Sequence, residues 1–468
     1  MKDTGGSEPA TVHHAELWGL REIWDRNPTG EKGLAGGKYH WLLSNDIQTT
    51  EWTYLEPQAP FYLFKPQDIA LGSEYDGGWK ITDVFPMNSV GIVTARDALT
   101  IRWSEENVWD IVRNFVKLPE HEAREKYNLG EDVQDWKVEW AQQDVKESGP
   151  DRNNIVPLLY RPFDTRFSYY TGKARGLICR PRHEVMRHML DRENLALVTT
   201  RQTRDQWDCL ATRSICGHKS CAAYDINTLF PLYLYPDPEE DRSLFANGTD
   251  RHVNLSPKFL EQMGKRLRLS FVVEGTGDLK KTFGPEDVFN YIYAVFHSPT
   301  YRMRYAEFLR IDFPRVPLTA DKKLLRALCS RGKELVALHL LESPKVSRSI
   351  TRYPVPGDDR VAKGHPRYVP PGEAESGTGK PLKKGRVYIS PDAPKSGTKG
   401  QYFEGVPPEV WEFHIGGYQV CEKWLKDRRG RNLSYDDLTH YQKVVVALKE
   451  TIRLMEEIDA AVPDWPIR

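Results

Sequence analysis

The sequence predicts a mixed α/β (α+β) fold, in which a strand-rich region with interspersed helices leads into a helical C-terminal part. Residues 79–102 and 155–235 are rich in β-branched and aromatic residues, which are typical of short strands. Between and after these segments, apolar side chains recur every three or four residues, which predicts helices. The last such stripe, within residues 438–455, predicts a strong helix near the end of the chain.

Length and composition exclude several classes of protein. The chain has 468 residues, of which 39% are hydrophobic and 11% aromatic, so it is long enough for roughly two to four domains and too apolar for a disordered chain. No apolar run approaches the ~20 residues of a membrane helix, and no signal peptide is visible at the start. Six cysteines do not make a disulfide framework in so long a chain. We therefore expect a cytoplasmic protein without membrane contact.

The N-terminal residues predict an acidic lead-in. Residues 1 to about 50 are expected to be mainly helical, with an interruption at the glycine-rich stretch 30–37. Prolines on both sides of Phe61–Phe64 indicate either an edge strand or an extended tether. Two short strands are expected within residues 79–102.

Helix signals follow in the next part of the chain. Ser104 can cap a helix whose first turn contains Glu105 and Glu106, where the helix dipole favours negative charge. A second helix is expected at about 132–147, with Trp136 and Trp140 one turn apart. Further helices are expected at about 257–267, at two places within 285–310 separated by Ser298–Pro299, and at 321–342.

The composition changes again after these helices. Residues 345–400 contain 8 Pro and 8 Gly, which predicts a long loop with short strands such as Arg386–Ile389. Ser434 and Asp437 then resemble a capping box. The stripe that follows predicts a face packed against the body of the protein, with a coiled-coil seam as the alternative. The expected divisions are a lead-in at 1–55, a recognition domain at 56–345, a Pro/Gly-rich basic segment at 346–400 and a helical part at 401–468.

Charge is balanced overall but not along the chain. The sequence has 66 basic and 66 acidic residues. Residues 1–60 nevertheless carry a net charge of −4, residues 152–218 carry +6, and residues 345–400 carry +7. Because a polyanion is met by a local patch, the two basic segments favour nucleic acid as a partner. Solvated faces without a partner are the alternative.

Catalytic motifs are missing. The nearest match to a phosphate-binding loop, at Gly377–Lys380, lacks the first glycine and the metal-binding hydroxyl. The tetrapeptide with which amino-methylating DNA methyltransferases hold a flipped base is absent. Asp144–Lys146 and Asp278–Lys280 match the triplet of metal-dependent nucleases, but chance explains such matches in a chain with 28% charged residues. No catalytic residue is assigned, and an enzyme with an unrecognised active site remains open.

Four residues within a short segment include the types that bind zinc: Cys209, Cys216, His218 and Cys221. Their spacing lacks the paired C-x2-C arrangement of known zinc motifs. Buried free thiols are the preferred interpretation, so no metal ligand is assigned.

Arginine and tyrosine alternate between Tyr160 and Arg187, which predicts a surface that contacts duplex DNA. Arginine can bind guanine edges and phosphates through two hydrogen bonds, and tyrosine offers a ring face and a hydroxyl. A structural alternative stays open, in which Arg161 and Asp164 form an internal ion pair and the tyrosines lie in the core. The candidate DNA-contacting residues are Arg166, Tyr169, Tyr170, Lys173, Arg175, Arg180 and Arg182, with Lys383, Lys384 and Arg386 in the second basic segment.

Several stretches resemble the C-terminal target-recognition (specificity) region of type ISP restriction-modification enzymes. They include YRPFDTRFSYYTG, RGLICRPRHEVMRHML, GIVTARDALTI and FPLYLYP, and the similarity runs from about residue 40 to about residue 460. Enzymes of that family join a nuclease, an ATP-driven motor, an N6-adenine methyltransferase and the recognition region in one polypeptide. This sequence resembles only the last part, and its first 50 residues are a candidate remnant of the methyltransferase end.

The resemblance implies sequence-specific recognition of duplex DNA within a restriction-modification system that defends against phage. No cofactor is expected in this chain, because S-adenosylmethionine would belong to the missing methyltransferase part. The expected partners are duplex DNA and, if the system is split, a polypeptide with the methyltransferase, motor and nuclease. The alternative is a protein-interaction or adaptor module of a defence complex that does not read DNA. A truncated gene and a split subunit both remain open.

Overall fold

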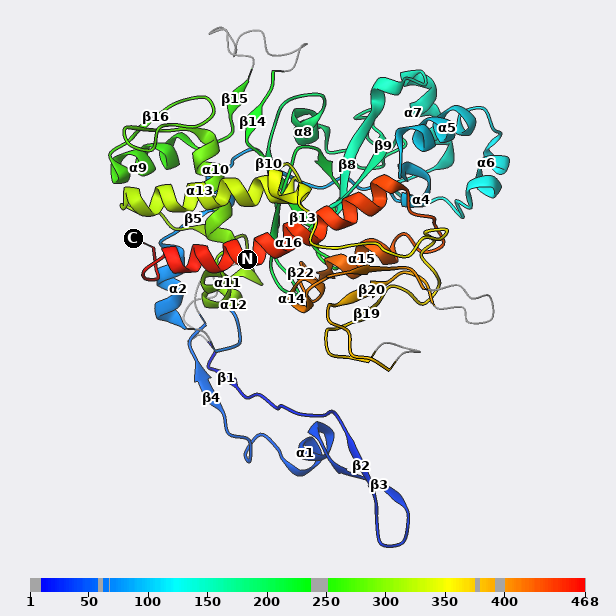
Figure 1. Cartoon of the computed structure of the whole chain (residues 1–468). Helices are drawn as coiled ribbons and strands as arrows, with labels where there is room; N and C mark the ends of the chain where they lie inside the picture. Colours follow the sequence, from blue (N-terminus) through cyan, green and yellow to red (C-terminus); the bar gives the residue numbers. More distant parts are fainter. Residues whose placement is uncertain are drawn as a thin grey trace, which may run out of the picture. The chain divides into compact units, whose positions relative to one another are not determined.

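Residues 10–57, 62–66, 68–236, 251–374, 379–391 and 400–467 are described by the computed structural model of the chain (Figure 1). Its contacts divide the chain into an N-terminal unit, Met1–Glu74, and a larger unit, Tyr75–Arg468. Helices and many small sheets alternate along the chain, which confirms the α+β prediction. The finer domain bounds expected from composition remain predictions.

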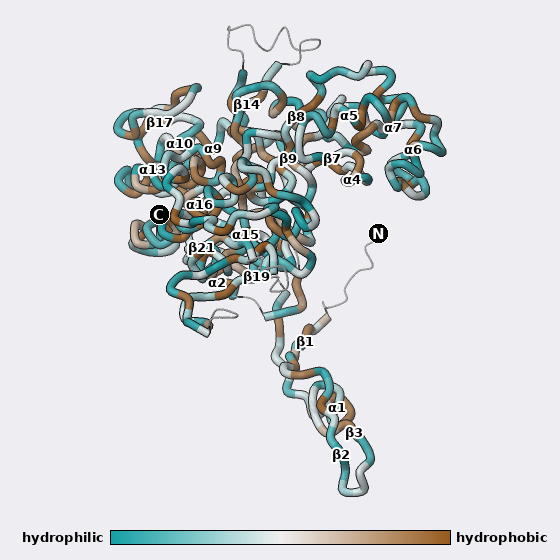
Figure 2. The backbone as a smooth tube through the Cα atoms, turned by 45° about the vertical axis from the view of Figure 1, so that its right-hand side comes forward, coloured by the Kyte–Doolittle hydropathy of each residue, from teal (hydrophilic) through white to brown (hydrophobic). Residues whose placement is uncertain are grey.

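The N-terminal unit is built from short strands and one helix. Its elements are β1 (Val12–His14), β2 (Ile23–Arg26), β3 (Lys32–Gly36), α1 (Lys38–Ser44) and β4 (Thr53–Leu55). β1 pairs with β4, and β2 pairs with β3, in both cases antiparallel. No residue of α1 is buried, although Figure 2 shows hydrophobic residues along it.

The prediction of a mainly helical lead-in is wrong, because a side-chain hydrogen-bonded turn joins two strands in this segment. The Asn27 side chain accepts hydrogen bonds from the backbone nitrogens of Thr29 and Glu31, which closes the turn between β2 and β3. Of the predicted edge strand or tether at Phe61–Phe64, Phe61 lies outside the described residues. The described remainder, Tyr62–Phe64, forms no strand.

Two four-stranded sheets lie in the larger unit. One joins, in order, β11 (Cys209–Thr212), β10 (Ala196–Thr200), β13 (Asn227–Pro231) and β6 (Ser89–Val90), all antiparallel. The other joins β12 (Ile215–Cys216), β8 (Ile155–Arg161), β9 (Asp164–Tyr169) and β7 (Ile101–Arg102), with only β12 and β8 parallel. Every residue of β10, β11 and β13 is buried, so both faces of the first sheet are covered.

A layer of helices packs against β9 of the second sheet. Its members are α5 (Glu105–Phe115), α6 (Glu120–Tyr127) and α7 (Val138–Ser148). The Ser104 hydroxyl accepts a hydrogen bond from the Asn107 nitrogen, so the predicted cap is confirmed. The helix expected from residue 132 begins only at Val138, because Val133 and Trp136 pair with each other in a tight turn.

Further helices follow β13 along the chain. They are α9 (Pro257–Leu267), α10 (Pro285–Phe296), α11 (Pro299–Arg304), α12 (Ala306–Leu309), α13 (Lys322–His339) and α16 (Tyr435–Ala461) (Figure 1). Of these, α13 packs against α10, α16 and strand β11 of the first sheet. The predicted break is confirmed, because Ser298 caps α11. Tyr441, Val445 and Leu448 of α16 are buried, so its apolar stripe packs against the body as predicted.

The Pro/Gly-rich segment forms a three-stranded antiparallel sheet together with the residues after it. Its strands are β19 (Arg367–Val369), β20 (Arg386–Tyr388) and β21 (Tyr402–Glu404). The strand expected at Arg386–Ile389 is therefore confirmed. The chain continues through α14 (Pro408–Trp411), β22 (His414–Ile415), β23 (Tyr418–Gln419) and α15 (Val420–Lys426) before α16 begins.

The remaining elements are short. They are α2 (Ile69–Asp76), β5 (Trp79–Lys80), α3 (Ile81–Val84), α4 (Asp97–Thr100), α8 (His183–Met186), β14 (Tyr233–Leu234), β15 (His252–Val253), β16 (Ser270–Phe271), β17 (Thr282–Phe283) and β18 (Arg315–Val316). Among the described residues, no helix combines the length and apolar character needed to span a membrane.

We expect Gly332→Ala to lower the melting temperature. A Cβ atom at Gly332 of α13 would lie 1.8 Å from the carbonyl oxygen of Asn290 in α10, so the two helices would have to separate. Such overpacking costs roughly 1–3 kcal/mol. Gly217→Ala is the matched control, because its nearest contact would be an ordinary 3.4 Å. Thermal unfolding followed by circular dichroism measures both, and equal melting temperatures would contradict the close approach of α10 and α13.

Candidate nucleic-acid interface

The loop that joins β9 to α8 exposes three of the predicted cations beside α7 (Figure 1). Lys173 forms an ion pair with Glu147 of α7. Arg180 forms an ion pair with Asp135, which precedes that helix. The guanidinium of Arg175 lies 5.5 Å from the ring centre of Trp140 in α7. The loop thus places three exposed cations along α7 and the residues just before it.

A buried carboxylate fixes this loop to α7. Asp144 accepts hydrogen bonds from the Thr171 hydroxyl at 2.9 Å and from the Leu177 backbone nitrogen at 2.8 Å. The Trp136 ring nitrogen donates to the Leu177 carbonyl at 3.1 Å. Burial raises the pKa of Asp144, and the hydrogen bonds from the loop work in the opposite direction. Asp144, one of the residues of the nuclease-like triplet, therefore serves as a structural acceptor.

Two arginines of this loop have a left-handed backbone conformation that residues other than glycine rarely adopt. Arg175 has φ +58° and Arg182 has φ +55°. A non-glycine residue in this left-handed region costs about 1 kcal/mol or more, and such strain clusters at functional sites. The loop therefore keeps arginine where glycine would be less strained. Arg182 itself is half-buried, unlike Lys173, Arg175 and Arg180.

Three other predicted DNA-contacting residues are buried, and for the two tyrosines among them this is the structural alternative, a place in the core. Tyr169 is 0% exposed, and its hydroxyl donates to the Gly149 carbonyl at 3.0 Å. Tyr170 is 3% exposed, and its hydroxyl donates to the Pro181 carbonyl. Arg166 is 8% exposed. In the described structure these side chains face the protein interior, where a duplex does not reach them.

Arg166 belongs to a buried ion cluster around Asp164. Its Nε and Nη2 atoms donate to Asp164 Oδ2 at 3.1 and 2.8 Å, and Nη2 of Arg428 donates to Asp164 Oδ1 at 2.9 Å. Burial by itself raises the pKa of Asp164, but the two guanidinium groups together hold it below its ordinary value. The proposed Arg161–Asp164 ion pair is thus corrected. The Arg161 guanidinium instead donates to the Tyr160 carbonyl and stacks on its ring.

Trp103 lies at the centre of this cluster and faces three guanidinium groups. Arg166, Arg431 and Arg428 lie 3.7, 3.9 and 4.6 Å from its ring centre. Burial lowers the pKa of the half-buried Arg431. Sequence reasoning did not single out Trp103, Arg428 or Arg431. The one available signal was the basic run that ends at Arg431, since nothing in the order of residues links it to Asp164.

The second basic segment places its cations differently. Lys383 and Lys384 are exposed just before β20. Arg386, inside β20, is half-buried, donates to Glu404 of β21 from Nε and Nη2 at 3.1 and 3.0 Å, and stacks on Tyr402. Of these three predicted residues, Lys383 and Lys384 are therefore the ones whose charge is exposed at the surface.

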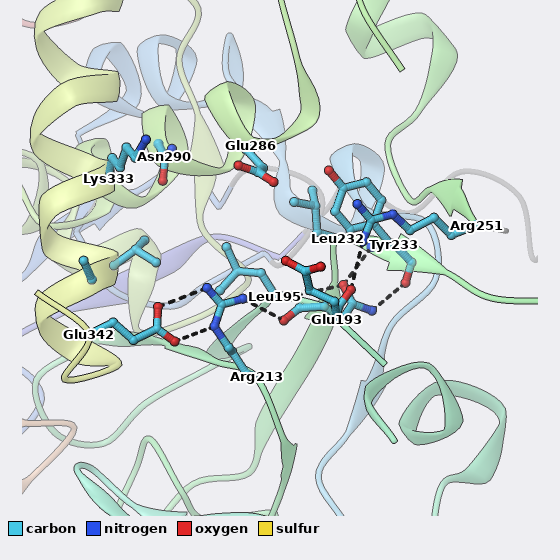
Figure 3. Close-up of a pocket in the computed structure, with 13 residues that line it drawn as sticks. Glu193, Leu195, Arg213, Leu232, Tyr233, Arg251, Glu286, Asn290, Lys333 and Glu342 are labelled. Carbon is cyan, nitrogen blue, oxygen red and sulfur yellow. Dashed lines mark hydrogen bonds and ion pairs between the residues drawn. The ribbon is translucent and has the colours of Figure 1, made fainter. Parts of the chain in front are cut away.

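A separate cavity of about 210 Å³ lies between β14, α10 and α13 (Figure 3). Charge pairs close its walls, because Arg213 binds Glu342 through two hydrogen bonds of 2.6 and 3.0 Å. Arg251 stacks on Tyr233 with 3.8 Å to the ring centre. Ligand pockets usually measure ~300 Å³ or more. We therefore assign no ligand to this cavity.

The chain is similar to one protein family and to several solved structures. The type ISP C-terminal specificity domain matches residues 83–457. No curated protein matches the chain. Among solved structures, the DrdV–DNA complex is 19% identical with a TM-score of 0.59, and a nuclease-deletion mutant of the type ISP restriction-modification enzyme LlaGI with a DNA substrate mimic is 18% identical with a TM-score of 0.56. The ATP-dependent type ISP restriction-modification enzyme LlaBIII bound to DNA is 17% identical with a TM-score of 0.59.

These three likenesses cover most of this chain but a minor part of the larger enzymes. They cover 89%, 88% and 89% of the present chain, in the order given. The chain spans 41%, 31% and 26% of the length of those proteins. At such low identity the likeness establishes a shared fold.

We expect Asp164→Asn to destabilise the chain by about 3–5 kcal/mol, because it leaves two buried guanidinium groups without their counter-charge. The pKa of Asp164 is lowered in the folded state, so its contribution is present above the ordinary pKa near 4 and is lost as the pH falls below that value. Urea unfolding at about pH 6 and about pH 3 measures both effects.

The gap between wild type and Asp164→Asn should therefore shrink on acidification. Asp110→Asn, at an exposed position of α5, is the control and should change stability by less than about 0.5 kcal/mol. A gap that is small at neutral pH, or that grows in acid, would contradict the ion cluster.

Proposed function

The chain belongs to the family of the type ISP C-terminal specificity domain, and on that premise we propose that it recognises target sequences in duplex DNA for a restriction-modification system. Methyl transfer and cleavage would fall to the methyltransferase, motor and nuclease parts of that system, and S-adenosylmethionine would bind to the methyltransferase part. Three structures with the same fold are complexes with DNA, which supports duplex DNA as the partner.

The observation that carries the proposal is the loop after β9, which is hydrogen-bonded to Asp144 and exposes Lys173, Arg175 and Arg180. Asp144 fixes the loop through hydrogen bonds to Thr171 and Leu177. DNA binding would therefore not have to order a flexible segment, and the entropy cost of binding is lower. Contacts of this kind bind phosphates and set the position of the duplex, whereas base edges are read by other side chains. Lys383 and Lys384 supply a second, weaker phosphate contact.

Acidic neighbours partly neutralise the positive charge of this loop. Lys173 pairs with Glu147, and Arg180 pairs with Asp135, all on partly exposed side chains. A phosphate must compete with these carboxylates for the cations. Non-specific binding is therefore weakened, and a duplex whose shape or sequence adds further contacts gains an advantage.

We expect the triple change of Lys173, Arg175 and Arg180 to Ala to flatten the salt dependence of DNA binding. If all three cations contact phosphates, the slope of log K against log[salt] should lose up to about 3 units. The matched control replaces Lys258, Lys265 and Arg266, three exposed cations of α9, and removes the same charge. Fluorescence anisotropy on random duplexes from about 50 to 200 mM salt measures the slopes.

Equal slopes for the loop variant and the α9 control would show that the loop does not contact phosphates. An absence of wild-type binding at low salt would reject the DNA-recognition proposal as a whole. Each variant is first checked for its native melting temperature, so that unfolding is not mistaken for lost binding.

We expect Glu147→Gln to strengthen DNA binding, because it frees Lys173 from its carboxylate partner. The gain should be several-fold at low salt and should shrink as salt rises. Glu139→Gln on the same helix makes the same charge change, and within the described structure Glu139 forms no ion pair. Anisotropy titrations of both variants give the comparison. An equal gain from both would mean that only total charge matters.

A second candidate function, protein interaction, is favoured by the N-terminal unit alone. Trp18, Leu43 and Ile47 are each 80% exposed there, and residues 1–60 carry a net charge of −4, which disfavours DNA. Removal of this unit should leave the salt slope unchanged under the DNA-recognition proposal.

A further inference from the structure

Three buried side chains with different ligand atoms meet beside the first sheet. Asp208 and Cys209 stand at the start of β11, and His297 follows the last residue of α10. One ligand atom from each lies within 4.8 Å of the others. They are 3%, 0% and 1% exposed, so solvent does not reach them. Carboxylate, thiolate and imidazole are the ligand types that zinc prefers.

The hydrogen bonds leave two of these groups with a lone pair that no described residue uses. Nδ1 of His297 lies 2.7 Å from the Tyr293 carbonyl oxygen, which can only accept, so Nδ1 carries the proton and Nε2 holds the lone pair. Asp208 Oδ1 accepts from Arg302 at 2.7 Å and from the Cys209 nitrogen at 2.9 Å. Neither His297 Nε2 nor Asp208 Oδ2 has a hydrogen-bond partner among the described residues.

This arrangement has two properties of metal sites. A ligating histidine usually donates its other ring proton to a backbone carbonyl or carboxylate, as His297 does here. Buried polar atoms are nearly always satisfied, so two unsatisfied acceptors in one cluster require an explanation.

We propose that Asp208, Cys209 and His297 bind a structural zinc ion. The Asp208 carboxylate and the Cys209 thiolate would supply two negative charges to balance the two positive charges of Zn²⁺.

The site is structural, because its three ligands are closed to solvent. It would fasten β11 of the first sheet to the junction of α10 and α11. The grouping differs from the one that the sequence suggested. Cys216 accepts a hydrogen bond from Asn227 at 3.5 Å, and Nδ1 of His218 faces the Ile92 carbonyl at 3.2 Å, so neither is part of it.

The test is the metal content of the purified full chain. After expression with added zinc and gel filtration, plasma mass spectrometry should find about one zinc per wild-type chain. The double variant Cys209→Ser with His297→Gln should hold less than about a tenth of that amount. Cys329→Ser, which alters another buried thiol in α13, is the matched control and should keep its zinc.

A second measurement keeps the proposal testable if the double variant does not fold. Wild-type chain refolded or expressed with Co²⁺ in place of zinc should show the intense visible bands of tetrahedral cobalt and a thiolate charge-transfer band. Chelator should remove these bands and lower the melting temperature. Less than about a tenth of an equivalent of zinc together with no cobalt spectrum in folded wild type would overturn the site. The DNA-binding measurements are independent of this result.

Discussion

The larger unit depends on one buried carboxylate, that of Asp164. It accepts hydrogen bonds from Arg166 on its own strand and from Arg428, which lies 264 residues further along the chain. An uncompensated charge at such a position would cost several kcal/mol, so folding must bring both arginines to it. Arg428 also lies 3.5 Å from Asp437 in the first turn of α16. The β8–β9 hairpin is thereby joined to the C-terminal helices, with Trp103 stacked between the guanidinium groups.

A second buried carboxylate, Asp144, organises the surface next to this hairpin. Its hydrogen bonds hold the loop after β9 at Thr171 and at Leu177, and the hydroxyls of Tyr169 and Tyr170 donate to the backbone carbonyls of Gly149 and Pro181. The aromatic and acidic residues of the segment thus form the support. The cations of the loop, including Arg175 in a left-handed conformation, are left for the surface. Fixing a charged loop in advance lowers the entropy cost of binding.

The net charge of zero over the whole chain does not show which charges are buried in pairs and which are exposed at the surface. Buried acids are matched by buried arginines, as at Asp164 and Asp208, and these pairs contribute to the assembly of the fold. Exposed cations such as Lys173 form ion pairs with acidic neighbours, and such pairs contribute little free energy because water screens them. A net charge of zero is therefore compatible with a locally positive surface, because only the exposed part of the charge acts on a partner.

The sequence by itself determined the helix starts and the packing stripe of α16. Ser104 and Ser434 cap their helices as predicted, because caps and helical periods depend on residues within one or two turns. Only the tertiary structure decided the partner of Asp164, the burial of Tyr169 and Tyr170, and the meeting of Cys209 with a histidine 88 residues away. These outcomes depend on contacts between distant segments, and the free energy of burying a charge or a ring is fixed by neighbours that local sequence does not contain.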